Sequence, residues 1–398
     1  MVFSQKAQRC SLSPMRKFTP YAMAAEAAGK KIYKLNIGQP DIETPPAFFE
    51  AVRGFSQKVL AYANSQGMEL MLNAVVNYYK RIGVDYEKQD ILITTGGSEA
   101  LQILFLCILD EGSEVIVPEP FYSNYNTFIK AAGGVIRPLP TVPEEDYNYA
   151  KPAALEALIN EKTRAIAIIN PQNPTGNVLT EAELRAIADV AKKHNLYLIC
   201  DEVYREFVYD TDKTLCAGSL RDMDENVVVI DSVSKRFSAC GARVGMILSR
   251  NRELMAQTLK FAQGRLCTTT LEQVGAAALY SVGPEYFEKV RAEYKRRRDL
   301  CYRKLTAIPG VVCAKPMGAF YAMAKLPIDD ADEFTKFMLT DFEDHGETVM
   351  CSPAAGFYAT PGKGVNEIRI AYVLEEKELG RALDLLALGI EAYNKRYD

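Results

Sequence analysis

Short apolar runs and helical patterns alternate between about Ile91 and Arg250. Each run has five or six residues and is rich in Val, Ile and Leu, as expected of strands that are buried on both faces. The runs are DILITT (90–95), EVIVP (114–118), VIRPL (135–139), AIAIIN (165–170), LYLICD (196–201), VVVIDS (227–232) and VGMILS (244–249). Strands that alternate with helices favour an α/β fold, in which a mostly parallel seven-stranded sheet lies between helices.

The clearest helix signal is the segment TEAELRAIADVAKKHN. Thr180 and Glu183 stand at the spacing of a capping box, in which each side chain binds the backbone N–H of the other residue. Apolar residues then recur at helical spacing. We therefore predict a helix that begins after Thr180 and ends near His194, which takes a C-terminal helix position.

The strand signal fades after Arg250, and two helical stretches follow. The second, EYFEKVRAEYKRRRDLCYRKL, contains a basic run that could suggest a contact with nucleic acid. Glu285, Glu288 and Glu293 interleave with the basic residues, so we interpret the run as a solvated helix face.

From Val311 onward, short strand patterns (GAFYAMA and NEIRIAYV) mix with helical ones (ADEFTKFMLTDFEDHG and EKELGRALDLLALGIEAY). This mixture predicts a smaller α+β domain. A chain of 398 residues also exceeds the size at which a single core stops growing, so two domains are expected. We predict a large domain over residues 47–285 and a small domain formed by residues 1–46 and 286–398.

Net charge, cysteine content and histidine content narrow the class of protein. The formal charge of -4 argues against nucleic acid or an anionic membrane as the main partner. Nine scattered cysteines without a CxxC pair favour reduced thiols in a cytosolic protein over a disulfide framework or a zinc site. With only two histidines, we expect neither a His-based triad nor a metal site. No long apolar stretch suggests a secretory signal or a membrane span, so we predict a cytoplasmic protein.

Polar residues follow three of the predicted strands at the place where doubly wound sheets bind ligands, beyond their carboxyl ends. AIAIIN runs into NPQNPTG, which contains Asn173, and LYLICD ends at Asp201. VVVIDS ends at Ser232 and leads to Lys235. Acids and amides also cap strand ends for structural reasons, so their position alone does not identify a site.

The combination of these residues resembles a known enzyme family. The motifs NPQNPTG, DEVYREF and SVSKRFSACGARVG, each after a predicted strand, are similar to those of the fold-type I, class I and II aminotransferases, which use pyridoxal phosphate (PLP). The similarity extends from GQPD to NEIRIAYV and looks greatest to the bacterial aspartate-aminotransferase-like subgroup. It implies the PLP-dependent transferase fold, a PLP cofactor and a homodimer with a shared active site.

The resemblance also assigns roles around the cofactor ring. Lys235 would carry PLP as a Schiff base and then act as the free base that moves the substrate proton. Asp201 would pair with the ring nitrogen and keep it protonated. Tyr204 and Asn173 would donate hydrogen bonds to the ring oxygen. Tyr122 would stack on the ring, in place of the tryptophan of many relatives.

Lys235, Asp201, Tyr122 and the turn that contains Asn173 also have a purely structural interpretation. Lys235 could be a surface lysine at a strand-to-helix turn, and Asp201 could be the N-cap of a helix over VYREF. Tyr122 could belong to the core, and NPTG could be an ordinary turn.

The phosphate of the cofactor needs hydrogen-bond donors and positive charge. By resemblance, Gly97, Ser98 and Glu99 form the phosphate-binding turn at a predicted helix start, where backbone N–H groups are free. Ser232 and Arg243 resemble the other phosphate ligands. A glycine pair before a helix is also common in ordinary strand-to-helix loops.

Three further residues belong to the substrate and to the neighbouring subunit. Arg369, in NEIRIAYV, matches the arginine that binds the substrate α-carboxylate, and Asn173 would line the same substrate site. Gly38 lies where family members bring a backbone N–H close to this carboxylate, although a simple turn glycine is the alternative. Tyr62 resembles a tyrosine that reaches the phosphate of the neighbouring subunit.

The same scaffold hosts several reactions, and the fold does not choose between them. We predict an aminotransferase that moves an amino group between an L-amino acid and a 2-oxo acid by a ping-pong mechanism. A C–S β-lyase that uses the same residues is the first alternative. The second is a non-catalytic PLP-binding regulator, for whose DNA-binding module the residues before Pro46 leave no room.

The side chain of the substrate stays open. Several aspartate-active relatives have a lysine where this chain has Ser98. Arg16, Lys17 or an arginine of the partner subunit at position Arg265 could bind a side-chain carboxylate instead. Aspartate with 2-oxoglutarate is one candidate pair, and aromatic, alanine-type or branched substrates are the others.

Overall fold

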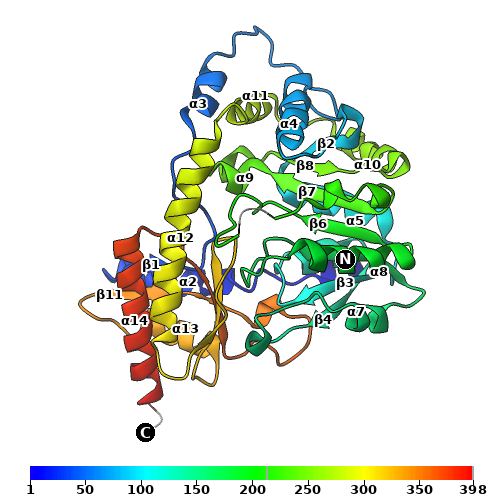
Figure 1. Cartoon of the computed structure of the whole chain (residues 1–398). Coiled ribbons are helices and arrows are strands. Elements are labelled where there is room, and N and C mark those ends of the chain that lie inside the picture. The colour runs from blue at the N-terminus through cyan, green and yellow to red at the C-terminus, as the bar shows by residue number, and fades with distance from the viewer. Residues whose placement is uncertain (212–213, 397–398) are drawn as a thin grey trace.

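The computed structural model describes residues 1–211 and 214–396. Its largest unit is a seven-stranded sheet with the order β2-β8-β7-β6-β5-β3-β4 (Figure 1). In that order the strands are β2 (Ile91–Thr94), β8 (Gly245–Leu248), β7 (Val227–Ser232), β6 (Tyr197–Asp201), β5 (Thr163–Ile169), β3 (Glu114–Glu119) and β4 (Val135–Pro140). Each coincides with a run predicted from the sequence, so the α/β class and the seven-stranded sheet are confirmed.

Six of these strands run in one direction, and β8 runs against them. β8 pairs antiparallel with both of its neighbours, β2 and β7. Its first residue therefore lies at the edge of the sheet where the other strands end. This reversal brings Arg243, which stands two residues before β8, to the edge where ligands bind.

Helices cover both faces of the large sheet. One face packs against α5 (Gly96–Ile108), α6 (Tyr125–Ala131) and α10 (Arg252–Arg265), and the other against α4 (Glu69–Arg81), α7 (Pro152–Leu158), α8 (Glu181–Lys193) and α11 (Thr270–Leu279). Within β5, Ala165 and Ala167 belong to the first core, whereas Ile166 and Ile168 belong to the second. This alternation is what a strand buried on both faces requires. No helix in the described part of the chain is long and apolar enough to cross a membrane.

The capping box predicted for α8 is present. The Thr180 hydroxyl accepts a hydrogen bond from the Glu183 N–H at 3.2 Å, and the Glu183 carboxylate accepts one from the Thr180 N–H at 2.9 Å. His194 is the C-cap residue of the same helix. Both predictions for this helix are confirmed.

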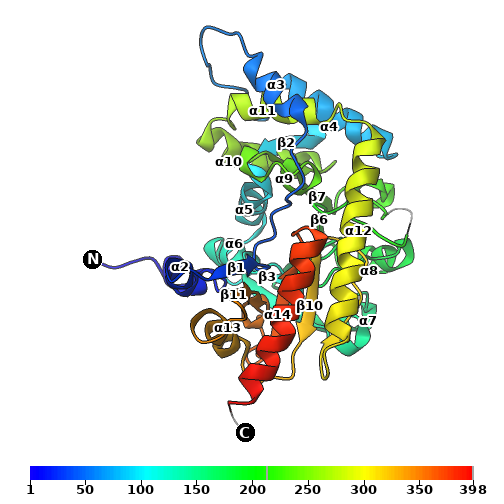
Figure 2. The same cartoon turned by 90° about the vertical axis from the view of Figure 1, so that its left-hand side faces the viewer.

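The N-terminal segment packs with the C-terminal part of the chain. β1 (Lys31–Lys34) pairs in parallel with β11 (Glu347–Met350), and α12 (Pro284–Thr306) and α14 (Glu376–Asn394) lie side by side (Figure 2). A second small sheet has the order β12 (Ser352–Pro353), β13 (Glu367–Ala371), β10 (Tyr321–Lys325) and β9 (Val312–Cys313). The other helices are α1 (Gln5–Arg9), α2 (Thr19–Ala27), α3 (Pro46–Arg53), α9 (Val233–Arg236) and α13 (Ala331–Thr340). The domain boundaries after residues 46 and 285 stay a prediction, with which the β1–β11 pairing agrees.

Two interpretations of the region after Arg250 are wrong. The first helical stretch is two helices, because Leu266 has a φ of 77° and ends α10 before α11 begins. The basic run on α12 is more than a solvated face, since Arg297 and Arg298 are buried and bind Asp41 and Asp210 at 2.7 and 2.8 Å. A buried guanidinium is stable only with such partners, and here they come from distant segments of the chain.

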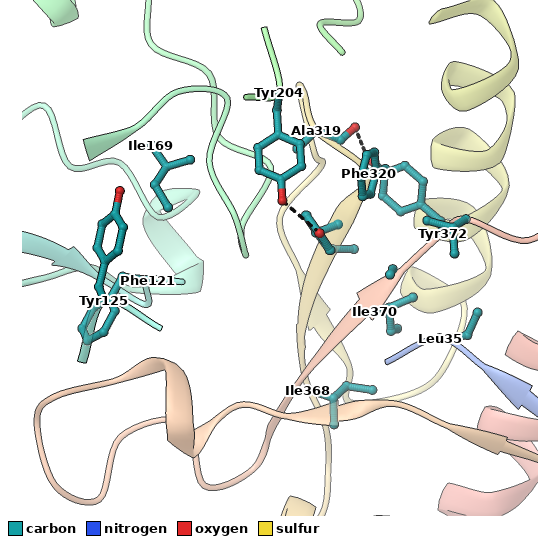
Figure 3. Close-up of a cluster of buried hydrophobic side chains, with 14 of the residues drawn as sticks. Leu35, Phe121, Tyr125, Ile169, Tyr204, Ala319, Phe320, Ile368, Ile370 and Tyr372 are labelled. Atoms are coloured by element: carbon teal, nitrogen blue, oxygen red, sulfur yellow. Dashed lines mark hydrogen bonds between the residues drawn. The ribbon is translucent and has the colours of Figure 1, made fainter. Parts of the chain in front are cut away.

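One hydrophobic cluster joins the large sheet to the four-stranded sheet of β12, β13, β10 and β9. Figure 3 shows Tyr204 beside Phe320, with Tyr372 and Ile370 continuing the cluster beyond them. The ring centroids of Tyr204 and Phe320 lie 5.3 Å apart in an edge-to-face arrangement. This packing fixes Tyr204, which follows β6, against β10.

Candidate active site

A cavity of about 680 Å³ opens at the carboxyl edge of the large sheet. Residues from the N-terminal segment, both sheets and the loops between them line it. Two of the predicted site residues, Glu99 and Tyr62, lie outside it. Eleven others share its wall, namely Gly38, Gly97, Ser98, Tyr122, Asn173, Asp201, Tyr204, Ser232, Lys235, Arg243 and Arg369.

Lys235 stands on α9, the short helix that follows β7. Ser232 caps this helix, and its hydroxyl accepts a hydrogen bond from the Ser234 N–H at 3.1 Å. The Lys235 ammonium donates to the Gly38 carbonyl at 2.8 Å and lies 3.6 Å from the Cys240 sulfur. The amine is therefore held between the large sheet and the N-terminal segment, inside the cavity rather than at the outer surface.

Asp201 ends β6, and only 6% of its surface is exposed. Its Oδ1 accepts a hydrogen bond from the Val203 N–H at 3.3 Å, and no basic side chain in the described residues forms an ion pair with it. Burial raises the pKa of Asp201 to about 7. Turns follow at residues 203–206, so the alternative role as a helix N-cap is wrong. A buried carboxylate without an ion-pair partner fits a site whose ligand carries a positive charge and places it beside the carboxylate.

A chain of hydrogen bonds joins the polar residues on the opposite side of the cavity. The Tyr204 hydroxyl accepts a bond from the Asn173 amide at 3.2 Å and shares another with the Tyr321 hydroxyl at 3.0 Å. The side-chain oxygen Oδ1 of Asn173 accepts a bond from Arg369 Nη1 at 3.2 Å. Burial raises the pKa of Tyr204 well above its ordinary value, so the phenol keeps its proton and can donate it to a ligand oxygen.

Arg369 is buried and only partly satisfied. Its Nη2 donates to the Asn36 carbonyl at 2.8 Å, while its Nε has no hydrogen-bond partner among the described residues. The guanidinium lies 4.6 Å from the ring centroid of Tyr321 and 5.0 Å from that of Phe357. An arginine with a free, buried N–H is suited to bind a carboxylate.

The turn before α5 offers backbone donors to an anion. The first N–H groups of a helix have no partner within the helix, and at the start of α5 those of Gly97 and Ser98 belong to residues that line the cavity. The Glu99 carboxylate accepts a hydrogen bond from the Thr95 N–H at 2.6 Å and pairs with Arg265 Nε at 3.1 Å. The Glu99 side chain is thus used at the helix start and by Arg265, and Glu99 does not line the cavity, so its predicted phosphate role stays a prediction that this geometry does not support.

Two glycines allow this turn to approach β8 and Arg243. A Cβ at Gly96, which has a φ of 74°, would overlap the Arg243 guanidinium. A Cβ at Gly245 would overlap the backbone of Gly96 and Gly97. The close approach sets the distance between the free N–H groups and the Arg243 side chain.

Gly245→Ala is therefore expected to weaken binding of PLP about 10- to 100-fold, because the added methyl group displaces the turn by steric overlap. Titration of the cofactor-free protein with PLP measures this change. Gly241→Ala is the matched control, since a Cβ there meets no atom within 4 Å. Equal affinities for the two variants would contradict a phosphate site at this turn.

Tyr122 and Tyr62 differ in their surroundings. Tyr122 lines the cavity, its hydroxyl accepts a hydrogen bond from Asn124 Nδ2 at 2.7 Å, and burial raises its pKa to about 12. Tyr62 is 82% exposed, on the segment between α3 and α4. Its position fits a contact with a second subunit rather than with the cavity of its own chain.

Tyr321 is a central residue of the cavity that the sequence analysis missed. It contacts both Tyr204 and Arg369, and a Cβ at Gly38 would overlap its hydroxyl. GAFYAMA reads as a strand, and nothing in that pattern distinguishes the tyrosine from a core residue. The antiparallel pairing of β10 with β13, which brings Tyr321 near Arg369, exists only in the fold. Gly38 is consequently required by close packing and is no simple turn glycine.

The residues of the cavity fit the cofactor that the sequence predicted. An amine, a buried acid without a cation and free backbone donors beside Arg243 correspond to the aldehyde, the ring nitrogen and the phosphate of PLP. Tyr122 supplies an aromatic wall, and the Nε of Arg369 remains free for a carboxylate.

Comparison with known proteins agrees with this geometry. The family described as "Aminotransferase class I and II" matches residues 30–386. The chain is 32% identical to the aspartate aminotransferase of Bacillus subtilis (strain 168), over 99% of this chain and 100% of the relative. It resembles the structure of the aspartate aminotransferase from Thermus thermophilus with maleate, with a TM-score of 0.89 and 27% identity over 98% and 100% of the two chains. The alanine aminotransferase from Pyrococcus furiosus also has a TM-score of 0.89, with 28% identity over 98% and 100%.

The match extends over nearly the whole chain, and together with the relatives it favours transamination over C–S lysis. The PLP-dependent transferase fold, the cofactor and the enzyme class predicted from the sequence are confirmed. The chain belongs to the class I and II aminotransferases and is a PLP-dependent transaminase.

Proposed function

We propose that the eleven predicted residues around the cavity are the active site of an enzyme that passes an amino group from an L-amino acid to a 2-oxo acid in two half-reactions. The observation that carries this proposal is the convergence of Lys235, Asp201 and Arg369 on one cavity from three distant parts of the chain. Only a reaction that uses an amine, an acid and a carboxylate-binding arginine together requires this arrangement.

PLP supplies an electron sink for the carbanion that forms when the substrate loses its α-proton. When PLP is bound, Asp201 would keep the ring nitrogen protonated, and Tyr204 with Asn173 would donate hydrogen bonds to the ring oxygen. Arg369 would orient the substrate through its α-carboxylate, and Lys235 Nζ would take the proton from Cα and hold it for the return step. The backbone N–H groups of Gly97 and Ser98, together with Ser232 and Arg243, would hold the phosphate.

For the substrates, we propose an acidic pair, aspartate with 2-oxoglutarate, as the first to be tested. The support is that the Bacillus subtilis and Geobacillus stearothermophilus relatives, at 32% and 30% identity, are aspartate aminotransferases. An aromatic-amino-acid aminotransferase of Thermococcus litoralis is 31% identical, so aromatic donors belong in the same test.

We further propose that the enzyme works as a homodimer in the cytoplasm. Exposed apolar side chains around Tyr62, such as Val59 and Leu60 at 71% and 60%, support a subunit contact at this segment. Nine free cysteines support a reducing compartment. A monomer in sedimentation experiments at working concentration would contradict the shared site.

The proposed function is tested by giving the PLP-loaded enzyme an amino acid alone. A transaminase is expected to form about one 2-oxo acid per site and then stop until a 2-oxo acid acceptor is added. Absorbance follows the cofactor, and chromatography follows the products. Continued release of ammonia and pyruvate without an acceptor would instead identify a lyase.

A further inference from the structure

The wall of the cavity has one more basic side chain than the proposed reaction uses. Of the residues that line it, Arg16, Lys235, Arg243 and Arg369 are basic, and Asp201 alone is acidic. Asp201 serves the ring nitrogen and Lys235 the aldehyde, while Arg243 serves the phosphate and Arg369 the α-carboxylate. Arg16 is the one basic side chain of this wall to which the proposed function assigns no group of the cofactor or substrate.

Arg16 also has no partner inside the protein. Its guanidinium forms neither an ion pair nor a hydrogen bond with any of the described residues. The two other candidates from the sequence are engaged elsewhere. Lys17 forms an ion pair with Asp332 and does not line the cavity, and Arg265 pairs with Glu99 of the same chain.

Neighbouring residues place Arg16 at the Arg369 end of the cavity. The sulfur of Met15 lies 3.5 Å from Arg369 Nη2, and the Cα atoms of Met15 and Arg16 are about 3.8 Å apart because they are consecutive. Phe18, two residues further on, is buried against Leu339 and Met350. The segment is thus fixed on both sides of Arg16, with the guanidinium free to reach into the cavity.

We infer that Arg16 binds a second carboxylate of the substrate and makes the enzyme selective for amino dicarboxylic acids and their 2-oxo counterparts. This inference rests on the proposed function, because it assigns the side-chain end of the same substrate. A dicarboxylic amino acid held by Arg369 carries its second carboxylate one or two methylene groups from Cα, and Arg16 is the unpaired cation of the same cavity wall beside Met15 and Arg369. Two arginines at this end match two carboxylates in charge and in hydrogen-bond geometry.

The test compares Arg16→Gln with Lys17→Gln in the PLP-loaded enzyme. Lys17→Gln removes the adjacent cation and its tie to Asp332, so it controls for lost charge and for loosening of the segment. For Arg16→Gln, kcat/KM for aspartate is expected to fall about 10- to 100-fold, whereas that for alanine changes less than about twofold. Lys17→Gln is expected to leave the ratio of the two constants unchanged.

Binding of unreactive acids gives a second readout that does not depend on turnover. Calorimetry is expected to show that Arg16→Gln weakens succinate by the same factor as aspartate and leaves propionate unaffected. Equal losses for aspartate and alanine, or an equal change of their ratio in Lys17→Gln, would overturn the role of Arg16. If the parent enzyme transaminates only neutral amino acids, the inference fails and the proposed function stands. If it transfers no amino group at all, the proposed function itself fails.

Discussion

Lys235→Ala is expected to lower kcat by about 10⁴-fold with every donor, while the protein still folds and binds PLP. The variant loses both the amine that attaches the cofactor and the base that moves the substrate proton. The remaining ligands are untouched, because Arg243, Ser232 and Asp201 reach the cavity from other elements. Within residues 1–211 and 214–396, the side-chain hydrogen bonds lost are those of the ammonium with the Gly38 carbonyl and the Cys240 sulfur.

Three measurements separate a catalytic loss from a folding defect. Borohydride reduction followed by peptide mass spectrometry should fix the cofactor to Lys235 in the parent enzyme and to no peptide in the variant. Lys235→Arg keeps the positive charge without forming the attachment, so it should be as inactive as Lys235→Ala. Thermal unfolding should give nearly equal midpoints for all three proteins. Turnover of Lys235→Ala at the parent rate would refute the assignment.

Asp201→Asn is expected to raise the stability of the cofactor-free protein at high pH and to lower the activity of the PLP-loaded enzyme. Burial raises the pKa of Asp201 to about 7, above its ordinary value of about 3.9. The folded protein therefore keeps a proton that the unfolded chain releases between about pH 4 and 7, and its unfolding free energy falls as the pH rises through this window. Asparagine is neutral at every pH, so the unfolding free energy of the variant does not fall for this reason.

The cofactor-free variant should consequently be more stable than the parent at pH 8, by on the order of 2–4 kcal/mol, and equally stable below about pH 4. Urea unfolding at several pH values measures the difference, and Asp110→Asn, at an exposed aspartate, is the control. In the PLP-loaded enzyme the same substitution removes the partner of the ring nitrogen and should lower kcat about 10²- to 10³-fold. A stability difference that is independent of pH would contradict the explanation that burial raises the pKa of Asp201 in the folded protein.

The elements of the large domain could be predicted because their signals are local. Each strand of the large sheet is a short apolar run, and the start of α8 carries its own capping pair, Thr180 and Glu183. The direction of β8 could not be predicted, because the run VGMILS has the same composition whichever way it pairs. The burial of Arg297 and Arg298 was missed for a related reason: their partners stand far away in the sequence.

The candidate site divides in the same way. Residues that stand in motifs after a strand, such as Asp201 and Lys235, could be predicted to share a cavity, and they do. The positions of Tyr321 and Arg16 at the cavity depend on how β10 and the N-terminal segment pack over the large sheet. No local sequence pattern carries that information. The bond from the Thr95 N–H to the Glu99 carboxylate was missed, because the same residue stands in a motif that resembles a phosphate-binding turn.

The pairing of β2 with β8 constrains when the protein can be assembled during synthesis. β2 stands at the edge of the large sheet, and β8 is its one neighbour there. A nascent chain that has left the ribosome only as far as β7 can already align β3 to β7, but it leaves β2 and the turn that follows it undocked. The pocket for the phosphate thus closes late, after Leu248 has emerged, and until then the growing polypeptide exposes an unpaired strand that a chaperone could shield.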